Sequence, residues 1–211
     1  IRGGRVDPVR YDKMALTPFG EVMPGIRYWP WLQKKLLGLA ANGMSFDLSE
    51  GKAPRAFSVE PGPVSIVTPI CFEITKPGVC RRLALASDHV PTLLLNLTND
   101  GWFGGFNPAR EQHLQIARWR AAELGVSVVR AANTGISTAI SPSGRVLARG
   151  VDGSSKASEV DGTLTVDVPV AAATTIYSRT GDVLGWSSLA GTVVTVVFAF
   201  FRGRRRSATV K

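Results

Sequence analysis

TPICFE, residues 68–73, is the stretch that decides how this chain is interpreted. It follows an apolar run, residues 64–67, and it places Cys71 two positions before Glu73. A free cysteine is more often a small buried hydrophobe than a reactive group, so the default interpretation of Cys71 is a core residue. A thiol that ends a strand near a cation or a base can instead be a nucleophile. The rest of the chain has to decide between these two interpretations.

The composition indicates a folded domain. The 211 residues are 45% hydrophobic, which is typical of a chain with a sizeable core. The net charge is +9, but five basic residues and no acidic residue lie within residues 202–211. This cluster directly follows an apolar run, so it indicates a membrane flank and not a nucleic-acid partner. Two cysteines, Cys71 and Cys80, are too few for a disulfide framework, and we interpret Cys80 as a packing residue.

A membrane span is predicted over residues 184–201, LGWSSLAGTVVTVVFAFF, which carry no charge. As a helix this segment extends about 27 Å, close to the roughly 30 Å of bilayer hydrocarbon. Trp186 lies at one end, where interfacial aromatics belong, and arginines follow the other end. The positive-inside rule predicts a basic cytoplasmic tail over 202–211 and places residues 1–183 on the outer side. A buried core helix or a pair of strands is the alternative.

Strands and helices alternate before this span, which predicts a mixed α/β domain. Apolar or alternating runs predict strands over 6–11, 92–97, 126–132, 137–141 and 163–168, and a hairpin of 55–60 with 64–70. The run 92–97, TLLLNL, is apolar almost throughout, which predicts a strand buried on both faces.

Two helices are predicted in this domain, over 74–86 and 108–124. The second is amphipathic, because four apolar residues share one face: Leu114, Ala117, Ala121 and Leu124. The polar segment 150–162 is expected to be a surface loop. Residues 24–53 contain aromatic residues beside Lys34 and Lys35, which suits a segment that lies in a lipid interface; a helix docked on the domain is the alternative.

Four short motifs line up along the chain: YDKMALTPFGE (11–21), TPICFE (68–73), NLTNDGWFG (96–104) and RAANTGIS (130–137). In this order they resemble the nitrilase, or carbon–nitrogen hydrolase, superfamily, and most closely its membrane branch, the apolipoprotein N-acyltransferase family. IYSRTGDVLGW (176–186) resembles the same branch. The resemblance implies a nitrilase-like four-layer α-β-β-α sandwich over 1–183, without its N-terminal part, followed by one C-terminal transmembrane helix.

The residue types in these motifs suit acyl transfer through a thiol. A thiol attacks a carbonyl best as a thiolate, and a nearby cation such as Lys13 lowers its pKa. Lys13 would also stabilise the oxyanion of a tetrahedral intermediate, together with the backbone N–H of Phe72. A helix that starts soon after Cys71 would add a partial positive charge. A base must still take the thiol proton and later the proton of an acceptor amine.

The resemblance implies roles for single residues. Cys71 resembles the nucleophile that forms a thioester, Lys13 the catalytic lysine, and Glu21 an additional active-site glutamate. Glu73 matches a further position that the family needs for activity, although it could simply hold the turn by backbone hydrogen bonds. The implied donor is a membrane phospholipid, and the implied acceptor is the N-terminal diacylglyceryl-cysteine of an apolipoprotein. Neither a cofactor nor a metal is implied, and the implied location is the bacterial inner membrane, with the domain on the periplasmic face.

The sequence also departs from the family pattern. The triad of the superfamily includes a glutamate well upstream of the lysine, and no glutamate precedes Lys13. We therefore expect the chain to be the C-terminal piece of a longer protein, and we expect this piece alone not to catalyse. The alternatives are a hydrolytic amidase of the same superfamily and a non-catalytic fragment that lacks the triad glutamate.

Further residues of the third motif are candidates for the site. Trp102, Phe103 and Asn99 are candidates for the substrate pocket, although the two aromatic residues suit a core equally well. Asn99 and Asp100 are typical of a turn. His113, on the predicted helix 108–124, is interpreted as a structural histidine and not as a base.

Overall fold

The computed structural model describes residues 9–18, 20–22, 48–88, 90–104, 106–150 and 163–208, with the single residues 25, 29, 31 and 35. Contacts divide the chain into two units, Ile1–Ser178 and Arg179–Lys211. Most of the predicted interfacial segment 24–53 and of the predicted loop 150–162 lies outside the described residues.

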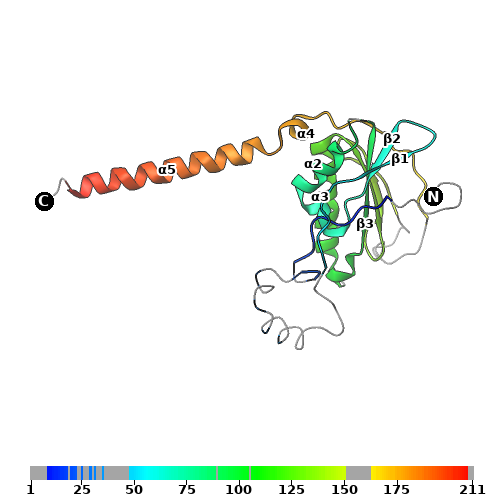
Figure 1. Cartoon of the computed structure of the whole chain (residues 1–211), viewed down its shortest axis with the longest axis horizontal. Helices are drawn as coiled ribbons and strands as arrows, with labels where there is room; N and C mark the ends of the chain where they lie inside the picture. The colour runs from blue at the N-terminus through cyan, green and yellow to red at the C-terminus, as the bar shows by residue number, and fades with distance from the viewer. Residues whose placement is uncertain are drawn as a thin grey trace. The chain divides into compact units, whose positions relative to one another are not determined.

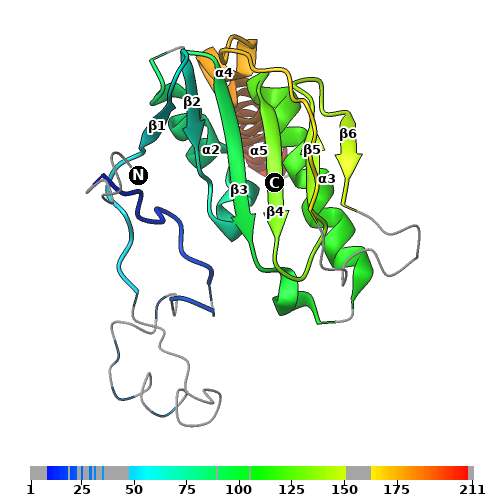
Figure 2. The ribbon, with the colours of Figure 1, turned by 90° about the vertical axis from the view of Figure 1, so that its right-hand side faces the viewer.

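Six strands form one mixed sheet, and their order across the sheet is their order along the chain (Figure 2). The strands are β1 (Ala56–Val59), β2 (Val64–Val67), β3 (Thr92–Thr98), β4 (Ser127–Ala132), β5 (Thr138–Ile140) and β6 (Val146–Arg149). The three strands β2, β3 and β4 are parallel, and the remaining neighbours are antiparallel. The carboxyl ends of β2 and β3 therefore lie at the same edge of the sheet. The chain leaves β2 through TPICFE and leaves β3 through NLTNDGWFG, so both motifs lie at this edge.

The predicted hairpin is confirmed. β1 and β2 pair in an antiparallel ladder that runs from Ala56 opposite Val67 to Val59 opposite Val64. The prolines at 61 and 63 have no N–H to donate to a ladder, so the strands end on either side of them. β2 ends earlier than predicted, at Val67, and Ile70 makes only an isolated parallel bridge with Leu97.

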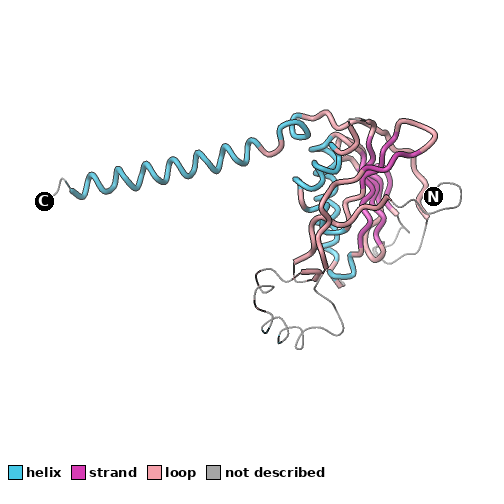
Figure 3. The backbone as a smooth tube through the Cα atoms, in the orientation of Figure 1, coloured by secondary structure: helices cyan, strands magenta, loops and turns pink. Residues whose placement is uncertain are grey.

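Two helices cover one face of the sheet (Figures 1 and 3). α2 (Pro77–Leu85) begins at a proline, which suits the first turn of a helix because its missing N–H would have no helical partner there. α3 (Asn107–Leu124) ends where Gly125 adopts a left-handed backbone with φ 69°. Its predicted apolar face is confirmed, because the four residues Leu114, Ala117, Ala121 and Leu124 are buried.

The core lies between these helices and one face of the sheet. Paired residues form a row across the central strands that is fully buried: Val67, Leu94, Val128 and Ile140. This row packs in one cluster with the buried residues of α2 and α3. The described part of the chain thus supplies two layers of the expected sandwich, one sheet and the helices on one of its faces.

The prediction that residues 92–97 are buried on both faces was wrong for the described structure. The β3 side chains that face the helices, Leu94 and Asn96, are fully buried, whereas Leu97 on the opposite face is 46% exposed. Period-two alternation of side chains separates the two faces of a strand. Among the described residues, nothing covers the opposite face of β3 at Leu97.

Two further predictions differ from the structure, and one strand was not predicted. Residues 163–168 belong to no strand among the described residues; Pro169, which has no N–H, follows them, and Ala171 makes an isolated bridge with Thr92. The described part of the predicted strand 6–11, residues 9–11, pairs with no strand either. Conversely, β6 was not predicted, because VLAR lacks a clear alternation of apolar and polar residues.

The second unit, Arg179–Lys211, contains the whole of α5 (Val183–Ala208), which follows the short helix α4 (Ile176–Thr180). Within α5, Val183–Phe200 is long and apolar enough to cross a membrane. This agrees with the predicted span 184–201. The helix continues through the start of the predicted basic tail, because arginine is a good helix former.

Candidate active site

Cys71 lies at a strained turn four positions after Val67, the last residue of β2. Its φ is 49°, in the left-handed region that non-glycine residues rarely adopt. Such a conformation costs on the order of 1–3 kcal/mol and persists only where the surrounding structure enforces it. A 3₁₀ helix, η2 (Cys71–Thr75), begins at the same residue. Cys71 is free and only partly buried, so this turn presents a thiol that a reactant can approach.

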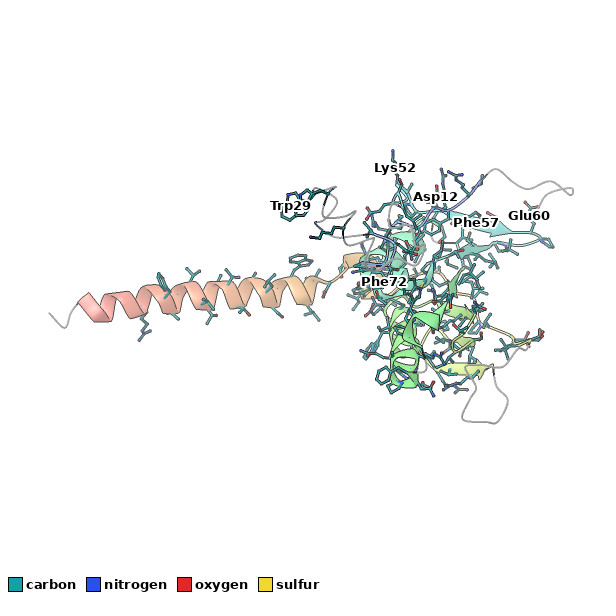
Figure 4. All side chains as sticks on the ribbon, turned by 90° about the horizontal axis from the view of Figure 1, so that it is seen from below. Asp12, Trp29, Lys52, Phe57, Glu60 and Phe72 are labelled. Carbon is teal, nitrogen blue, oxygen red and sulfur yellow. The ribbon has the colours of Figure 1, made fainter. Side chains whose placement is uncertain are left out.

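A pocket of about 370 Å³ lies beside Cys71. Apolar and polar residues line it, and the surface that they present to the pocket is mostly apolar: Thr17, Cys71, Phe72, Thr75, Asn99, Asp100, Trp102, Phe103, Ala109, Gln112, His113 and Ile116. The ammonium group of Lys76 lies over the ring of Phe72, 4.8 Å from the ring centre; Phe72 is labelled in Figure 4. The structure thus brings Cys71 together with the three residues that the sequence proposed for a pocket, Asn99, Trp102 and Phe103.

Glu73 is fully buried and joins the Cys71 turn to the segment that carries Lys13. Its Oε1 accepts hydrogen bonds from the backbone N–H of Met14 (2.6 Å), the backbone N–H of Ala15 (3.0 Å) and the hydroxyl of Tyr11 (2.8 Å). Its Oε2 accepts one from the backbone N–H of Ile70 at 2.7 Å. A carboxylate that is engaged by four donors fixes two backbone segments against each other. This geometry favours the positioning role over an acid–base role.

Lys13 forms a compact cluster with Glu21. Its Nζ lies 2.6 Å and 2.9 Å from the two carboxylate oxygens and 3.3 Å from the hydroxyl of Thr17. Burial opposes the ionisation of Glu21, but the hydrogen bonds from Lys13 and Thr17 outweigh it and hold the pKa of Glu21 below its ordinary value. Thr17 also lines the pocket beside Cys71, so the Lys13–Glu21 pair adjoins that pocket.

Lys13 lies in an irregular segment and not at the end of a strand, and Gly51 supports this segment. The backbone N–H of Gly51 donates to the carbonyl of Lys13 at 2.7 Å. A Cβ at position 51 would overlap the carbonyl oxygen of Asp12 and lie 2.6 Å from its carbonyl carbon. Asp12 is labelled in Figure 4. The close approach of these two backbones therefore requires glycine at position 51.

We expect Gly51→Ala to displace the Lys13 segment and to slow acylation of Cys71 by about 10-fold or more, because small displacements of catalytic groups are costly. The measurement is the rate of acyl-Cys71 formation by mass spectrometry in the full-length protein. Gly78→Ala is the matched control, because a Cβ at position 78 would meet no atom within 4 Å. Equal rates in the two variants would contradict this role of Gly51.

A second buried cluster lies under the pocket. Arg130 NH2 contacts Asp100 Oδ2 at 2.5 Å, and its NH1 donates to Asn96 Oδ1 at 2.7 Å. His113 Nδ1 lies 3.0 Å from Asp100 Oδ1. Burial alone would raise the pKa of Asp100, but the hydrogen bond from His113 and the charge of Arg130 hold it at about 2. His113 is therefore a hydrogen-bonded structural histidine that also lines the pocket.

We expect the stabilising contribution of Asp100 to be lost in acid. The pKa of Asp100 is about 2 in the folded protein and about 3.9 in an unfolded chain. The contribution is therefore fully present above the unfolded pKa and disappears as the pH falls towards 2. The measurement is the free energy of unfolding of the parent and of Asp100→Asn across this range. The difference between them should narrow as the pH falls, since a protonated Asp100 resembles asparagine; a constant difference would contradict the assignment.

The other cysteine is not part of the pocket. Cys80 is fully buried on α2, and its thiol contacts the carbonyl oxygen of Glu73 at 3.3 Å. Burial raises the pKa of Cys80 to about 12, so this thiol is not ionised near neutral pH. Both cysteines are free, which agrees with the interpretation of Cys80 as a packing residue.

Sequence reasoning missed several residues of this site. Tyr11, Thr17 and Arg130 lie within the quoted motifs, but their partners are distant in sequence; Tyr11 and Glu73 are 62 positions apart. Asn99 was a candidate for the pocket, and its side chain also accepts the N–H of Gly101 at 3.0 Å, which confirms its place in a turn. Among the described residues, no group of three or more His, Cys, Asp or Glu side chains could hold a metal ion.

The fold and the site together define an α/β protein that presents a cysteine thiol from a strained strand-to-helix turn beside an apolar pocket. The carbon–nitrogen hydrolase family matches residues 10–177, and the chain belongs to this family.

Curated relatives are similar over most of the chain. The chain is 40% identical over 174 residues to an apolipoprotein N-acyltransferase of Bradyrhizobium diazoefficiens, which covers 82% of this chain and 29% of that protein. A protein of the same name from Geobacter metallireducens is 34% identical over 193 residues, 92% of this chain and 34% of that protein. The chain thus spans about a third of the length of these relatives.

Solved structures are more distant. Nit3 of Saccharomyces cerevisiae, a member of the nitrilase superfamily, has a TM-score of 0.37 and 18% identity over 48% of this chain and 38% of its own. An amidase of the same superfamily from Nesterenkonia has a TM-score of 0.39 and 20% identity over 50% of this chain and 39% of its own. These likenesses are too low to add to the family assignment.

Proposed function

We propose that the protein is an N-acyltransferase that moves an acyl chain from a phospholipid, through a thioester on Cys71, to the N-terminal diacylglyceryl-cysteine of a bacterial apolipoprotein. The observation that carries the proposal is the position of Cys71, a free thiol on a strained turn beside a largely apolar pocket. An apolar pocket suits a hydrocarbon chain. The names of the curated relatives and the apolar helix α5 support the same activity.

In the first step, the thiolate of Cys71 attacks the ester carbonyl of the phospholipid. A bond forms between Sγ and the carbonyl carbon, and the bond from that carbon to the glycerol oxygen breaks. The leaving oxygen takes up the proton that the thiol lost, so the first product is a lysophospholipid. The acyl chain remains on Cys71, with the pocket wall of Phe72, Phe103 and Ile116 available to hold its hydrocarbon.

In the second step, the α-amino group of the acceptor attacks the thioester. A bond forms between nitrogen and the carbonyl carbon, the bond to Sγ breaks, and one proton of the amine returns to the Cys71 sulfur. The product is an amide, and the thiol is regenerated. Lys13 acts in both steps as the cation that stabilises the oxyanion, together with the backbone N–H of Phe72. Glu21 holds the ammonium group of Lys13 in place through two short contacts.

The apolar helix α5 supports a membrane arrangement for the proposed enzyme. Val183–Phe200 would cross the bacterial inner membrane, and the arginines from position 202 onward would remain on the cytoplasmic side. The domain of residues 1–183 would then lie on the periplasmic face, where both lipid substrates are accessible. Trp29 and Trp31 are 58% and 66% exposed, which suits contact of their segment with a lipid interface.

The decisive experiment supplies the full-length protein, in proteoliposomes, with a phospholipid that carries a labelled acyl chain and a synthetic diacylglyceryl-cysteine peptide. Mass spectrometry of the peptide, of the protein and of the released lipids follows the label. We expect the label first on Cys71 and then on the peptide nitrogen. Release of the label only as free fatty acid would replace the proposal by a hydrolase, and no label on Cys71 would refute both.

A further inference from the structure

A continuous chain of buried polar contacts links the Cys71 turn to the wall of the pocket. The side-chain amide of Asn96 donates to the carbonyl oxygen of Pro69 at 2.8 Å, two residues before Cys71. Arg130 donates to the other end of the same amide and to Asp100. Asp100 starts the 3₁₀ helix η3 (Asp100–Phe103), which supplies two aromatic residues of the pocket wall.

His113 completes this chain from the opposite side. Its Nδ1 contacts Asp100, and its ring lies edge-to-face with the ring of Phe103, at a centroid distance of 5.8 Å and an interplanar angle of 81°. Edge-to-face aromatic pairs of this kind have a preferred geometry. The position of Phe103 therefore depends on the position of His113, which in turn depends on Asp100.

A gain in the stability of the fold does not by itself explain why these polar and charged side chains are buried. The side chains of Asn96 and Arg130 are fully buried, and Asp100 is 1% exposed. Burying an ion pair costs desolvation energy that its attraction repays only with good geometry, and apolar replacements of such pairs are often at least as stable. What the pair does provide is fixed geometry, because a guanidinium group imposes a planar fork of donors on Asn96 and Asp100.

We infer that Asn96, Arg130, Asp100 and His113 form a positioning network that sets the reactive thiol and the pocket wall relative to each other. One end of the network fixes the carbonyl of Pro69 and thereby the Cys71 turn; the other end fixes Phe103. The network would thus determine which acyl chain lengths reach the thiol in a reactive position. The chain-length part of this inference rests on the proposed function, whereas the effect on the thiol does not.

Gly135 allows the network to be disturbed without removing any of its polar groups. A Cβ at position 135 would overlap Oδ2 of Asp100 and lie 2.7 Å from its Cγ. Gly135→Ala therefore displaces the Asp100 carboxylate. His113→Asn serves as a second variant, because asparagine keeps a donor near the position of Nδ1 but removes the ring that contacts Phe103. Gly78→Ala, on α2, is the control, since its Cβ would meet no atom within 4 Å.

The experiment makes two measurements on the full-length protein and its variants, after thermal melts have shown that each is folded. The first is the alkylation rate of Cys71 with iodoacetamide. The second is the rate of acyl-Cys71 formation from p-nitrophenyl butyrate and from p-nitrophenyl palmitate. We expect Gly135→Ala to change the alkylation rate and to slow acylation by palmitate about 10- to 100-fold. We expect His113→Asn to alter the ratio of the palmitate to the butyrate rate.

Each outcome decides a separate question. If the parent is acylated and both variants match Gly78→Ala in alkylation and in the ratio of the two ester rates, the network has no positioning role. If both variants slow the two esters equally and leave alkylation unchanged, the role in chain-length selection is overturned. If the parent is acylated by neither ester, the role in chain-length selection is overturned for these donors, the labelled phospholipid decides the proposed function, and the alkylation rates alone decide whether the network positions the thiol.

Discussion

Cys71→Ala and Cys71→Ser should each abolish acyl-enzyme formation, lowering its rate by a factor on the order of 10⁴ or more. Alanine removes the nucleophile. Serine places a hydroxyl where the thiol was. The pKa of this hydroxyl lies far above that of a thiol, so the Lys13–Glu21 cluster does not activate it as a nucleophile. The measurement is the acyl adduct on residue 71, followed by mass spectrometry after the full-length protein is mixed with phospholipid.

The second cysteine provides the control for this prediction. Cys80→Ala should still be acylated at Cys71, because Cys80 is fully buried and does not line the pocket. Its own phenotype should be a modest loss of stability from the small cavity that the missing sulfur leaves. Membrane insertion should be the same in all three variants, since neither cysteine lies in α5. Full activity in Cys71→Ala would refute the assignment of the nucleophile.

Local sequence patterns were sufficient to predict much of the fold. The hairpin of β1 and β2, the strand β3 and the helix α3 each follow from a pattern within one short segment: prolines between two apolar runs, an apolar run, or a 3.6-residue periodicity. The same reasoning failed at residues 163–168, because alternation favours an extended chain but does not supply a partner strand.

The candidate site, like the fold, was predictable from the sequence only in part. Cys71, Lys13, Glu21 and Glu73 could be selected from the motifs that surround them. The contacts that hold them could not, because they join residues that are far apart in the sequence: Met14 to Glu73, Asn96 to Pro69, and Arg130 to Asp100. Asp100 was interpreted as a turn residue, and only its burial against Arg130 shows that it also anchors a polar network.

Glu73→Ala should destabilise the protein far more than Glu73→Gln, because the two variants leave different numbers of buried or partly buried donors without an acceptor. Alanine leaves the N–H groups of Met14, Ala15 and Ile70 without an acceptor, as well as the hydroxyl of Tyr11. A buried donor that loses its partner costs about 1–3 kcal/mol, and the donors other than Met14 are only partly buried, so we expect a loss of about 4 kcal/mol in the free energy of unfolding. Urea titration of the full-length protein and its variants measures this quantity.

Glutamine at position 73 affects only one of the two segments that Glu73 joins. With its carbonyl oxygen at the position of Oε1, it still accepts from Met14, Ala15 and Tyr11, while its amide group opposes the N–H of Ile70. We therefore expect a loss of about 1–3 kcal/mol in stability, together with a fall of about 100-fold in acylation, since the released residue adjoins Cys71. If Glu73 instead transferred protons, both variants would abolish acylation, whatever the difference in their stability. Tyr11→Phe, which removes one donor and keeps the carboxylate, should lose only about 1 kcal/mol and remain active.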